Sequence, residues 1–155
     1  MPRLVVMSSA APIPGNPTPS AEQVDALVQT SFDVVAVVTR VGAEHDLSLT
    51  LVRLIGILRD RTLTMAELAD YLGLERSTVS GLIDRAERRG LVARQPSAAD
   101  GRSVELRITD DGLKLAALAT AEIADRLAPL VGRMPQDLQR ALPLLRDALQ
   151  GPPRR

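Results

Sequence analysis

The sequence predicts a mainly α-helical protein in which a helix-turn-helix is followed by a small β-hairpin. Three observations carry this expectation. Apolar residues recur at helical spacing through most of the chain after residue 20, a glycine-containing turn separates two short helical segments near residue 73, and apolar and polar residues alternate over 103–108. A helix-turn-helix with an attached hairpin is a winged helix. We therefore expect a three-helix core with a two-stranded β-wing, flanked by long N- and C-terminal helices.

Composition excludes several classes of function. The 155 residues contain no cysteine, and His45 is the only histidine, so disulfides, thiol redox chemistry and Cys- or His-rich metal sites are excluded. No run approaches the about 18 apolar residues of a membrane span, and the first residues do not form a signal peptide. The expectation is a cytoplasmic protein with no metal, no cofactor and no membrane association.

The first long helix is expected from Ser20 to about Val41, after a proline-rich tail over residues 1–19 that is expected to be disordered. The run Val34–Val38 is β-branched, but no turn signal occurs before Gly42, so the segment is interpreted as helix. Its apolar surface is continuous. This indicates burial on more than one side, as in a helix shared with a partner subunit.

Two shorter helices follow. Ser48 is expected to cap a helix to about Asp60, in which Leu51, Leu54, Ile55 and Leu58 form the buried stripe. Thr64 and Glu67 have the spacing of a capping box, in which each side chain bonds the other residue's backbone N–H. The helix that they start is expected to end at Gly73, a natural C′ residue.

A further helix is expected from about Arg76 to Arg89, ending at Gly90, and the hairpin comes next. Residues 91–94 form its first strand, Asp100-Gly101 its turn, and residues 103–108 its second strand.

Thr109 then caps a long helix that Pro129 and residues 132–135 are expected to end. A last helix spans about Gln136–Leu149, and Pro143 should kink or split it. A short tail covers residues 151–155.

The Arg76–Arg89 helix has two different sides. Val79, Leu82, Ile83 and Ala86 must face the core, which leaves small polar residues and arginines on the outer face. A helix that enters the major groove of DNA needs small residues where its backbone approaches, with short donors near base edges and arginine for bidentate contacts. The DNA-binding candidates on this helix are Arg76, Ser77, Thr78, Ser80, Gly81 and Arg85.

The charge distribution points to the same segment. The whole chain has a formal net charge of zero, but residues 76–107 contain seven arginines and four acids, a net +3. Arg94 on the first hairpin strand and Arg102 at the tip add candidates in a wing that projects toward the minor groove. Asp100 is also included, as a residue expected to position Arg102.

Two runs of sequence resemble the MarR family of winged helix-turn-helix transcriptional regulators: residues 68–92, LADYLGLERSTVSGLIDRAERRGLV, and residues 100–112, DGRSVELRITDDG. The resemblance covers about residues 20–150. It implies a homodimeric repressor on a palindromic operator, with a DNA-binding part at about 48–108 and dimerisation parts at about 20–45 and 109–150. It also implies possible release by a small-molecule effector at the hinge between these parts, where His45 and Arg53 are the ligand-binding candidates.

The sequence departs from the family pattern at two points. Glu75 stands where a serine or similar N-cap is more common, so this cap is expected to be weaker. Pro143 leaves the detail of the dimer interface open. Cysteine-based sensing is excluded because the chain has no cysteine.

Two alternatives remain. The winged helix could serve protein or RNA contacts instead of operator DNA, although the small-residue face and basic wing favour DNA. An enzyme is disfavoured, because no nucleophile–base pair or phosphate-binding loop is visible. Asp110-Asp111 is explained by its place in the first turn of a helix.

Overall fold

The structure, a computed structural model, describes residues 18–97 and 103–150 in two compact units that divide after Asp33. The first unit contains the beginning of helix α1, and the second contains the remainder. The predicted tails, the hairpin turn and its residues Asp100 and Arg102 lie outside the described residues. The elements are α1 (Ala21–Glu44), α2 (Leu49–Leu58), β1 (Leu63–Thr64), α3 (Met65–Leu72), α4 (Arg76–Arg88), β2 (Val92–Pro96), β3 (Val104–Ile108), α5 (Asp110–Arg133) and α6 (Gln136–Gln150).

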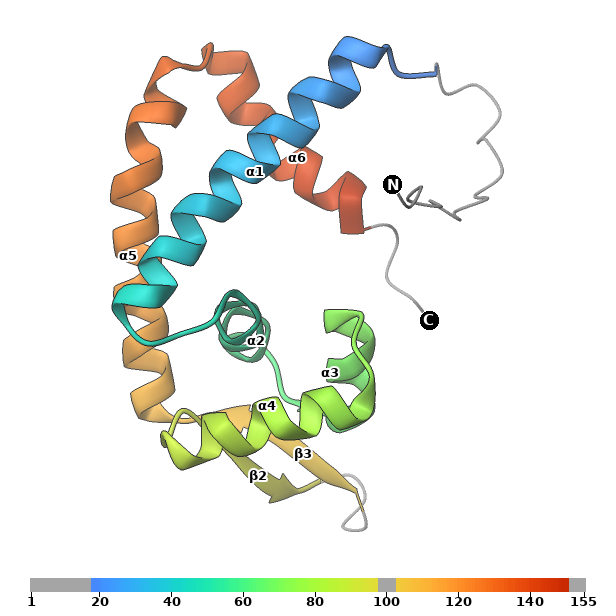
Figure 1. Cartoon of the computed structure of the whole chain (residues 1–155), viewed down its shortest axis with the longest axis vertical. Coiled ribbons are helices and arrows are strands. Elements are labelled where there is room, and N and C mark those ends of the chain that lie inside the picture. The colour runs from blue at the N-terminus through green and yellow to red at the C-terminus, as the bar shows by residue number, and fades with distance from the viewer. Residues whose placement is uncertain (1–17, 98–102, 151–155) are drawn as a thin grey trace, which may run out of the picture. The chain divides into compact units, whose positions relative to one another are not determined.

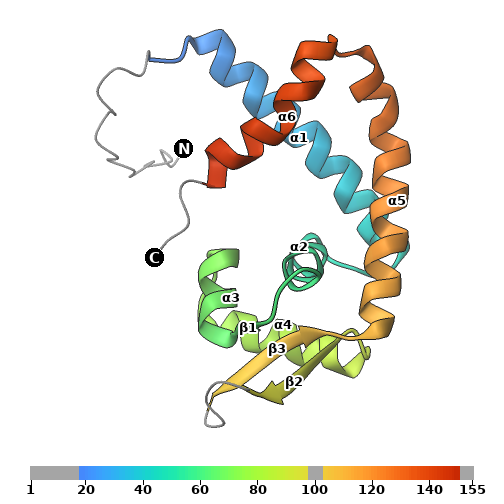
Figure 2. The same ribbon diagram turned by 180° about the vertical axis from the view of Figure 1, so that it is seen from behind.

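The second unit confirms a mainly helical fold with a small antiparallel sheet. Helix α3 packs against both α2 and α4, and α5 contacts α2 (Figures 1 and 2). Strand β2 lies against α4, and β3 lies against α2 and α3. The sheet contains one strand more than predicted, in the order β1-β3-β2. Leu63 of β1 pairs with Leu106 of β3 and is itself buried, which ties the loop before α3 to the wing.

The predicted helix stripes form the core. The four stripe residues of α2 and the four of α4 are all buried, and Leu54, Leu68 and Ile83 are completely enclosed. Leu106 extends this core into the sheet, where it is also fully buried. The inner face of α4 packs into an apolar cluster that includes residues of four helices (α2 to α5) and of all three strands, and this packing holds the outer face of α4 in place.

The predicted caps are present at four helices. The Ser20, Ser48 and Thr109 hydroxyls accept hydrogen bonds from backbone amides three residues ahead, at 3.1, 3.2 and 3.1 Å. Thr64 and Glu67 form the complete capping box, with Glu67 Oε2 accepting from both the Thr64 N–H and its hydroxyl at 2.8 Å. These local bonds fix where the core helices begin.

Replacing Thr64 with alanine should reduce the free energy of unfolding by about 1 kcal/mol at neutral pH, because an amide at the start of α3 loses its partner. The Thr64 backbone N–H and hydroxyl lower the pKa of Glu67. The stabilisation from this depressed pKa is present above the ordinary glutamate pKa and is lost as pH falls through the lowered value. Urea unfolding between pH 7 and pH 3 should therefore show a shallower acid loss for Glu67→Gln. Thr62→Ala, at an exposed residue just before the cap, is the control; an equal loss in Thr62→Ala and Thr64→Ala would contradict the capping role.

The long helices differ in part from the prediction. Helix α1 continues through Gly42 to Glu44. Gly42 is buried, and the chain passes so close to it that an added Cβ would lie 2.8 Å from the Leu47 carbonyl oxygen. Helix α5 ends at Arg133, within the predicted 132–135 stretch, but it continues through Pro129. Helix α6 runs unsplit through Pro143. One proline removes a single backbone hydrogen bond, and the turns on both sides maintain the helix.

Helix α1 also corrects the expectation that no run of the chain is apolar and long enough to span a membrane. Among the described residues it is the one helix that meets this test by length and composition, with a mean hydropathy of 1.3 over 18 residues. Threonine, serine and glutamine interrupt its apolar residues, but few of its residues are charged. The apolar face of α1 therefore needs a partner or an apolar environment.

Candidate nucleic-acid interface

The turn between α3 and α4 sets the direction of the candidate site. Gly73 adopts a left-handed conformation with φ of 67°, and its N–H and that of Leu74 bond back to the end of α3. Glu75 then occupies the N-cap of α4 without a side-chain cap hydrogen bond, in agreement with the weaker cap expected there. The first amides of α4 are therefore left to an external acceptor, which is the arrangement that binds phosphate at a helix N-terminus.

The outer face of α4 agrees with the periodicity argument. Arg76, Ser77, Thr78 and Arg85 are exposed, and Ser80 and Gly81 are half-buried. A Cβ added at Gly81 would have only the Arg85 Nη1 atom near it, at 3.8 Å. The face is thus shallow at its centre, with an arginine side chain beside the shallow point, and it presents donors to whatever approaches it.

Arg94 is placed differently from the other candidates. Its guanidinium Nη2 lies 2.8 Å from Asp84 Oδ1, its Nη1 pairs with Glu87 Oε2, and its backbone N–H donates to Glu87 Oε1 at 3.1 Å. Both acids belong to α4. The side chain of Arg94 therefore joins the wing to α4 and is already paired with two carboxylates.

Sequence reasoning missed the residues that anchor the wing. Ser97 is buried, its hydroxyl donates to Glu105 Oε1 at 2.5 Å, and its N–H donates to the Ser103 carbonyl at 2.9 Å. The sequence analysis gave no role to Asp84 or Glu87. Their spacing of three residues, which places both on one side of α4, was the available signal.

The two ligand-binding candidates do not converge. His45 lies in the turn after α1, where its Nε2 is 2.9 Å from Glu122 Oε2 of α5. Its backbone carbonyl accepts from Arg89 at 2.9 Å. Arg53 is exposed on α2 and makes no hydrogen bond or ion pair within the described part of the chain.

Further ion pairing links the end of α1 to α5. Arg126 Nη2 lies 2.5 Å from Glu44 Oε2, and this hydrogen bond lowers the pKa of Glu44. Together with the His45–Glu122 contact, this pair fixes the turn after α1 against α5. Arg89, just after α4, also contacts this turn: its Nη1 donates to the Asp46 carbonyl at 2.6 Å.

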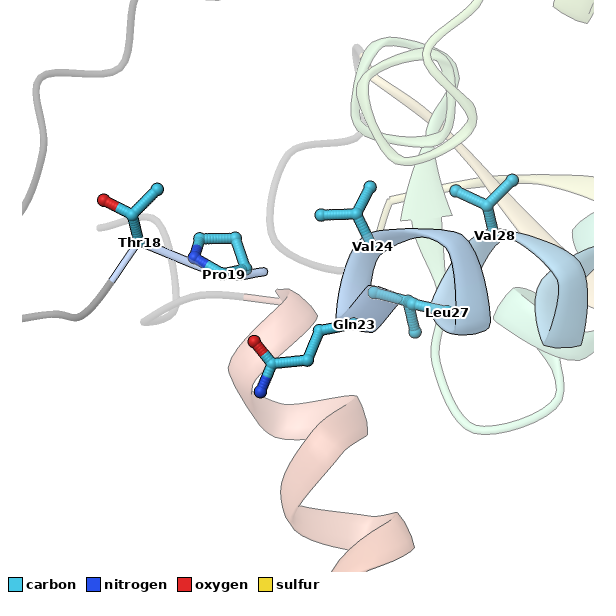
Figure 3. Close-up of a pocket in the computed structure, with 6 residues that line it drawn as sticks. All are labelled: Thr18, Pro19, Gln23, Val24, Leu27 and Val28. Atoms are coloured by element: carbon cyan, nitrogen blue, oxygen red, sulfur yellow. The ribbon is translucent and has the colours of Figure 1, made fainter. Parts of the chain in front are cut away.

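Two hollows among the described residues were compared with the positions of His45 and Arg53. One, of about 80 Å³, lies between α2 and α5 and is lined mainly by aliphatic side chains, with Arg59 and Thr120 as its polar members. Neither His45 nor Arg53 lines it. The other is an open hollow of about 480 Å³ at the start of α1, bordered by Val24, Leu27 and Val28 (Figure 3).

The comparison with known families decides the identity of the winged helix. Residues 45–103, which include α2, α3, α4 and the first wing strand, match the model of the MarR family. Over these residues the chain is similar to the MarR family. The sequence resemblance is thereby confirmed over residues 68–92 and for the first residues of 100–112.

Curated relatives match part of the chain. The HTH-type transcriptional regulator YfiV of Bacillus subtilis is 32% identical over 71 residues, which cover 45% of this chain and 44% of YfiV. The organic hydroperoxide resistance transcriptional regulator of B. subtilis is 37% identical over 54 residues, which cover 35% of this chain and 37% of that protein. The chain thus spans less than half the length of the curated relatives it matches.

Solved structures share the fold over most of the chain. RV1404 of Mycobacterium tuberculosis superposes with a TM-score of 0.74 at 25% identity, covering 89% of this chain and all of that one. NadR in complex with 4-hydroxyphenylacetate gives 0.71 at 23% identity, covering 89% and 96%. A mutant of Staphylococcus aureus MepR bound to an oligodeoxyribonucleotide gives 0.59 at 21%, covering 82% and 95%.

Proposed function

We propose that this MarR-family chain is a sequence-specific DNA-binding transcriptional regulator that acts in the cytoplasm as a dimeric repressor on a palindromic operator. The observation that carries the proposal is the outer face of α4, which is small, polar and arginine-flanked, on a helix whose inner face is locked into the core. The two curated relatives, both transcriptional regulators, and the DNA-bound MepR structure support it.

In the proposed complex, α4 enters the major groove. Ser77, Thr78, Ser80 and Gly81 allow close approach to the base edges, and Arg85 extends to a base or phosphate. Arg76 and the uncapped amides at the start of α4 bind phosphate. From the sequence we retain Arg102 as a minor-groove contact of the wing and Asp100 as its positioning residue. The DNA-binding part is residues 48–108.

A second copy of the chain is the proposed partner of α1. Val24, Leu27, Val28, Phe32 and Val35 recur at helical spacing along one side of α1 and are 40–63% exposed in the single chain. A continuous apolar stripe of this length is costly in water. A palindromic site requires two winged helices related by a two-fold axis. Residues 20–45 and 109–150 are the proposed dimerisation parts.

A small-molecule effector is proposed to act through helices α2 and α5. The cavity between them, about 80 Å³, is much smaller than the roughly 300 Å³ or more that ligand pockets usually have. Binding would therefore have to separate α2 from α5. Such a separation would change the distance between the two recognition helices from the about 34–36 Å that successive major-groove faces require. The NadR complex with 4-hydroxyphenylacetate supports an effector of this type.

The first experiment measures fluorescence anisotropy of the full chain with DNA from upstream of its own gene and with scrambled DNA, at two salt concentrations. Tighter, salt-dependent binding to the upstream DNA is the expected result. Equal binding to both DNAs would contradict sequence-specific regulation at this site. No binding at either salt concentration would favour the protein- or RNA-binding alternative.

Arg85→Ala should weaken binding to the specific DNA by about 5- to 150-fold, which corresponds to the about 1–3 kcal/mol of one base contact, and should relax sequence preference at one operator position. Binding to a panel of operators with single base-pair changes measures this. Arg140→Ala, which removes the same charge from an exposed position of α6, is the control and should change affinity little. If Arg85→Ala and Arg140→Ala weakened DNA binding equally, Arg85 would contribute only non-specific charge and would read no base.

A further inference from the structure

Arg94 carries most of the polar contact between the wing and the recognition helix. Its guanidinium spans Asp84 and Glu87, one turn apart on α4, while its backbone N–H bonds the second oxygen of Glu87. Its side chain is 33% exposed, and those of Asp84 and Glu87 are 48% and 29% exposed. We refer to these three residues as the clasp.

The position of the clasp gives it control over the wing. Arg94 pairs with Leu106 at the middle of the β2–β3 ladder, and Leu106 is completely buried in the core. The last pair of that ladder, Pro96 with Val104, lies only two residues further on. Fixing Arg94 to α4 therefore fixes the direction in which the strand pair leaves the protein.

The charges of the clasp argue against a phosphate contact at Arg94. Two carboxylates surround one guanidinium, so the group has a formal charge of −1 and does not attract a polyanion. An arginine that left this group to reach phosphate would break both ion pairs and leave two acids unpaired beside the DNA. Arg94 is therefore better suited to orient the wing than to contact DNA.

We propose that Arg94, Asp84 and Glu87 are positioning residues that set the angle between the wing and recognition helix α4, so that both meet the same DNA molecule. The inference rests on the proposed DNA-binding function and changes one part of it: Arg94 acts through the wing and does not touch the nucleic acid. The clasp then contributes to affinity for every DNA sequence, because it sets the position of the wing, whereas α4 reads the bases.

Two single variants and their combination test this proposal. Arg94→Ala and Glu87→Ala should each weaken binding to specific and scrambled DNA by about tenfold, and the double variant should lose no more than either single one, because one interaction is removed in all three. In both single variants the slope of log K against log salt should fall by the same amount, because each variant misplaces the wing and its Arg102 and neither removes a DNA contact of Arg94 itself. Thermal unfolding confirms that the variants are folded, and Arg140→Ala is the matched charge control.

Opposite effects of Arg94→Ala and Glu87→Ala on DNA affinity would overturn the proposal. If Arg94 bound phosphate, Arg94→Ala would lower the salt slope by about 0.9, and Glu87→Ala would release the arginine and tighten binding. A double variant whose loss of DNA affinity equals the product of the two single losses would also contradict a shared interaction. If the wild-type chain bound no DNA, the proposed function would fail. The clasp would then be judged on the free protein, where Glu87→Ala should speed hydrogen exchange of the Arg94 amide, and unchanged exchange would refute it.

Discussion

Replacing Gly112 with alanine is expected to lower the melting temperature by about 10 °C. An added Cβ would lie 2.2 Å from the Leu91 carbonyl oxygen and 2.7 Å from Ile108 Cγ1. The Leu91 oxygen belongs to backbone that cannot rotate away, and it also accepts the Thr109 N–H at 3.0 Å. Thr109 Oγ1 donates to the Gly90 carbonyl at 2.5 Å, so the start of α5 is fixed to the segment between α4 and β2.

The expected cost follows from this geometry. The methyl group must push α5 away from residues 90–91, and overpacking of this kind costs about 3 kcal/mol at a site that cannot yield. For a chain of this size each kcal/mol shifts the melting temperature by about 2–4 °C. The displacement also separates the long helix from the winged helix that it follows. We therefore expect DNA binding to weaken below the melting transition as well.

A second glycine of the same helix provides the control. At Gly132 an added Cβ meets no atom within 4 Å. Gly132→Ala should therefore be neutral or stabilise the chain by up to about 1 kcal/mol, because alanine loses less backbone entropy in a helix. Thermal unfolding followed by circular dichroism measures both variants. Equal melting temperatures would show that the start of α5 is free to move, contrary to the contacts at Leu91.

Features that depend on residues three or four apart were predictable from the sequence. The Thr64–Glu67 capping box, the buried stripes of α2 and α4 and the left-handed Gly73 are each specified within one or two helical turns. The outer face of α4 followed from the same periodicity, since the positions that remain after the core is filled must face outward. The uncapped start of α4 followed from Glu75 alone.

Features that depend on distant residues were not predictable in this way. Strand β1 is only two residues long and exists because Leu63 meets Leu106, more than 40 positions along the chain. The direction of Arg94 depends on the placement of β2 against α4, which brings two acids of that helix under its guanidinium. From the sequence, Arg94 was a reasonable DNA-binding candidate because it is an arginine on a strand of the wing. Only the tertiary contact shows that its charge is already paired.

The apolar stripe of α1 leads to the second large prediction, that Leu27→Glu will convert a dimer into monomers. Leu27 is 47% exposed in the single chain, between Val24, Val28 and Phe32 on the same side of the helix. In the proposed dimer this side chain enters an apolar interface, where an unpaired carboxylate loses its water and has no partner. The dimer dissociation constant should rise by about 100-fold or more, as for a central interface residue.

The effect on DNA binding should be equally large, because a monomer engages only half of a palindromic site. Affinity for the full operator should fall by several orders of magnitude, and the salt slope should drop to about half, since half of the phosphate contacts remain. Analytical ultracentrifugation without detergent measures assembly, and anisotropy measures DNA binding. Gln29→Glu adds the same charge on the other side of α1, where the exposed residue is already polar, and should leave the dimer intact.

The same measurements separate a second copy of the chain from other partners of α1. A wild-type chain that is monomeric without detergent would contradict the proposed dimer. A wild-type chain that stays in solution only when detergent is present would favour a membrane environment for α1, which its length and composition permit. A Leu27→Glu variant that remains dimeric and binds the operator normally would place the interface elsewhere. A monomeric Leu27→Glu variant beside a dimeric Gln29→Glu variant would mean that the stripe, and not α1 as a whole, holds the two subunits together.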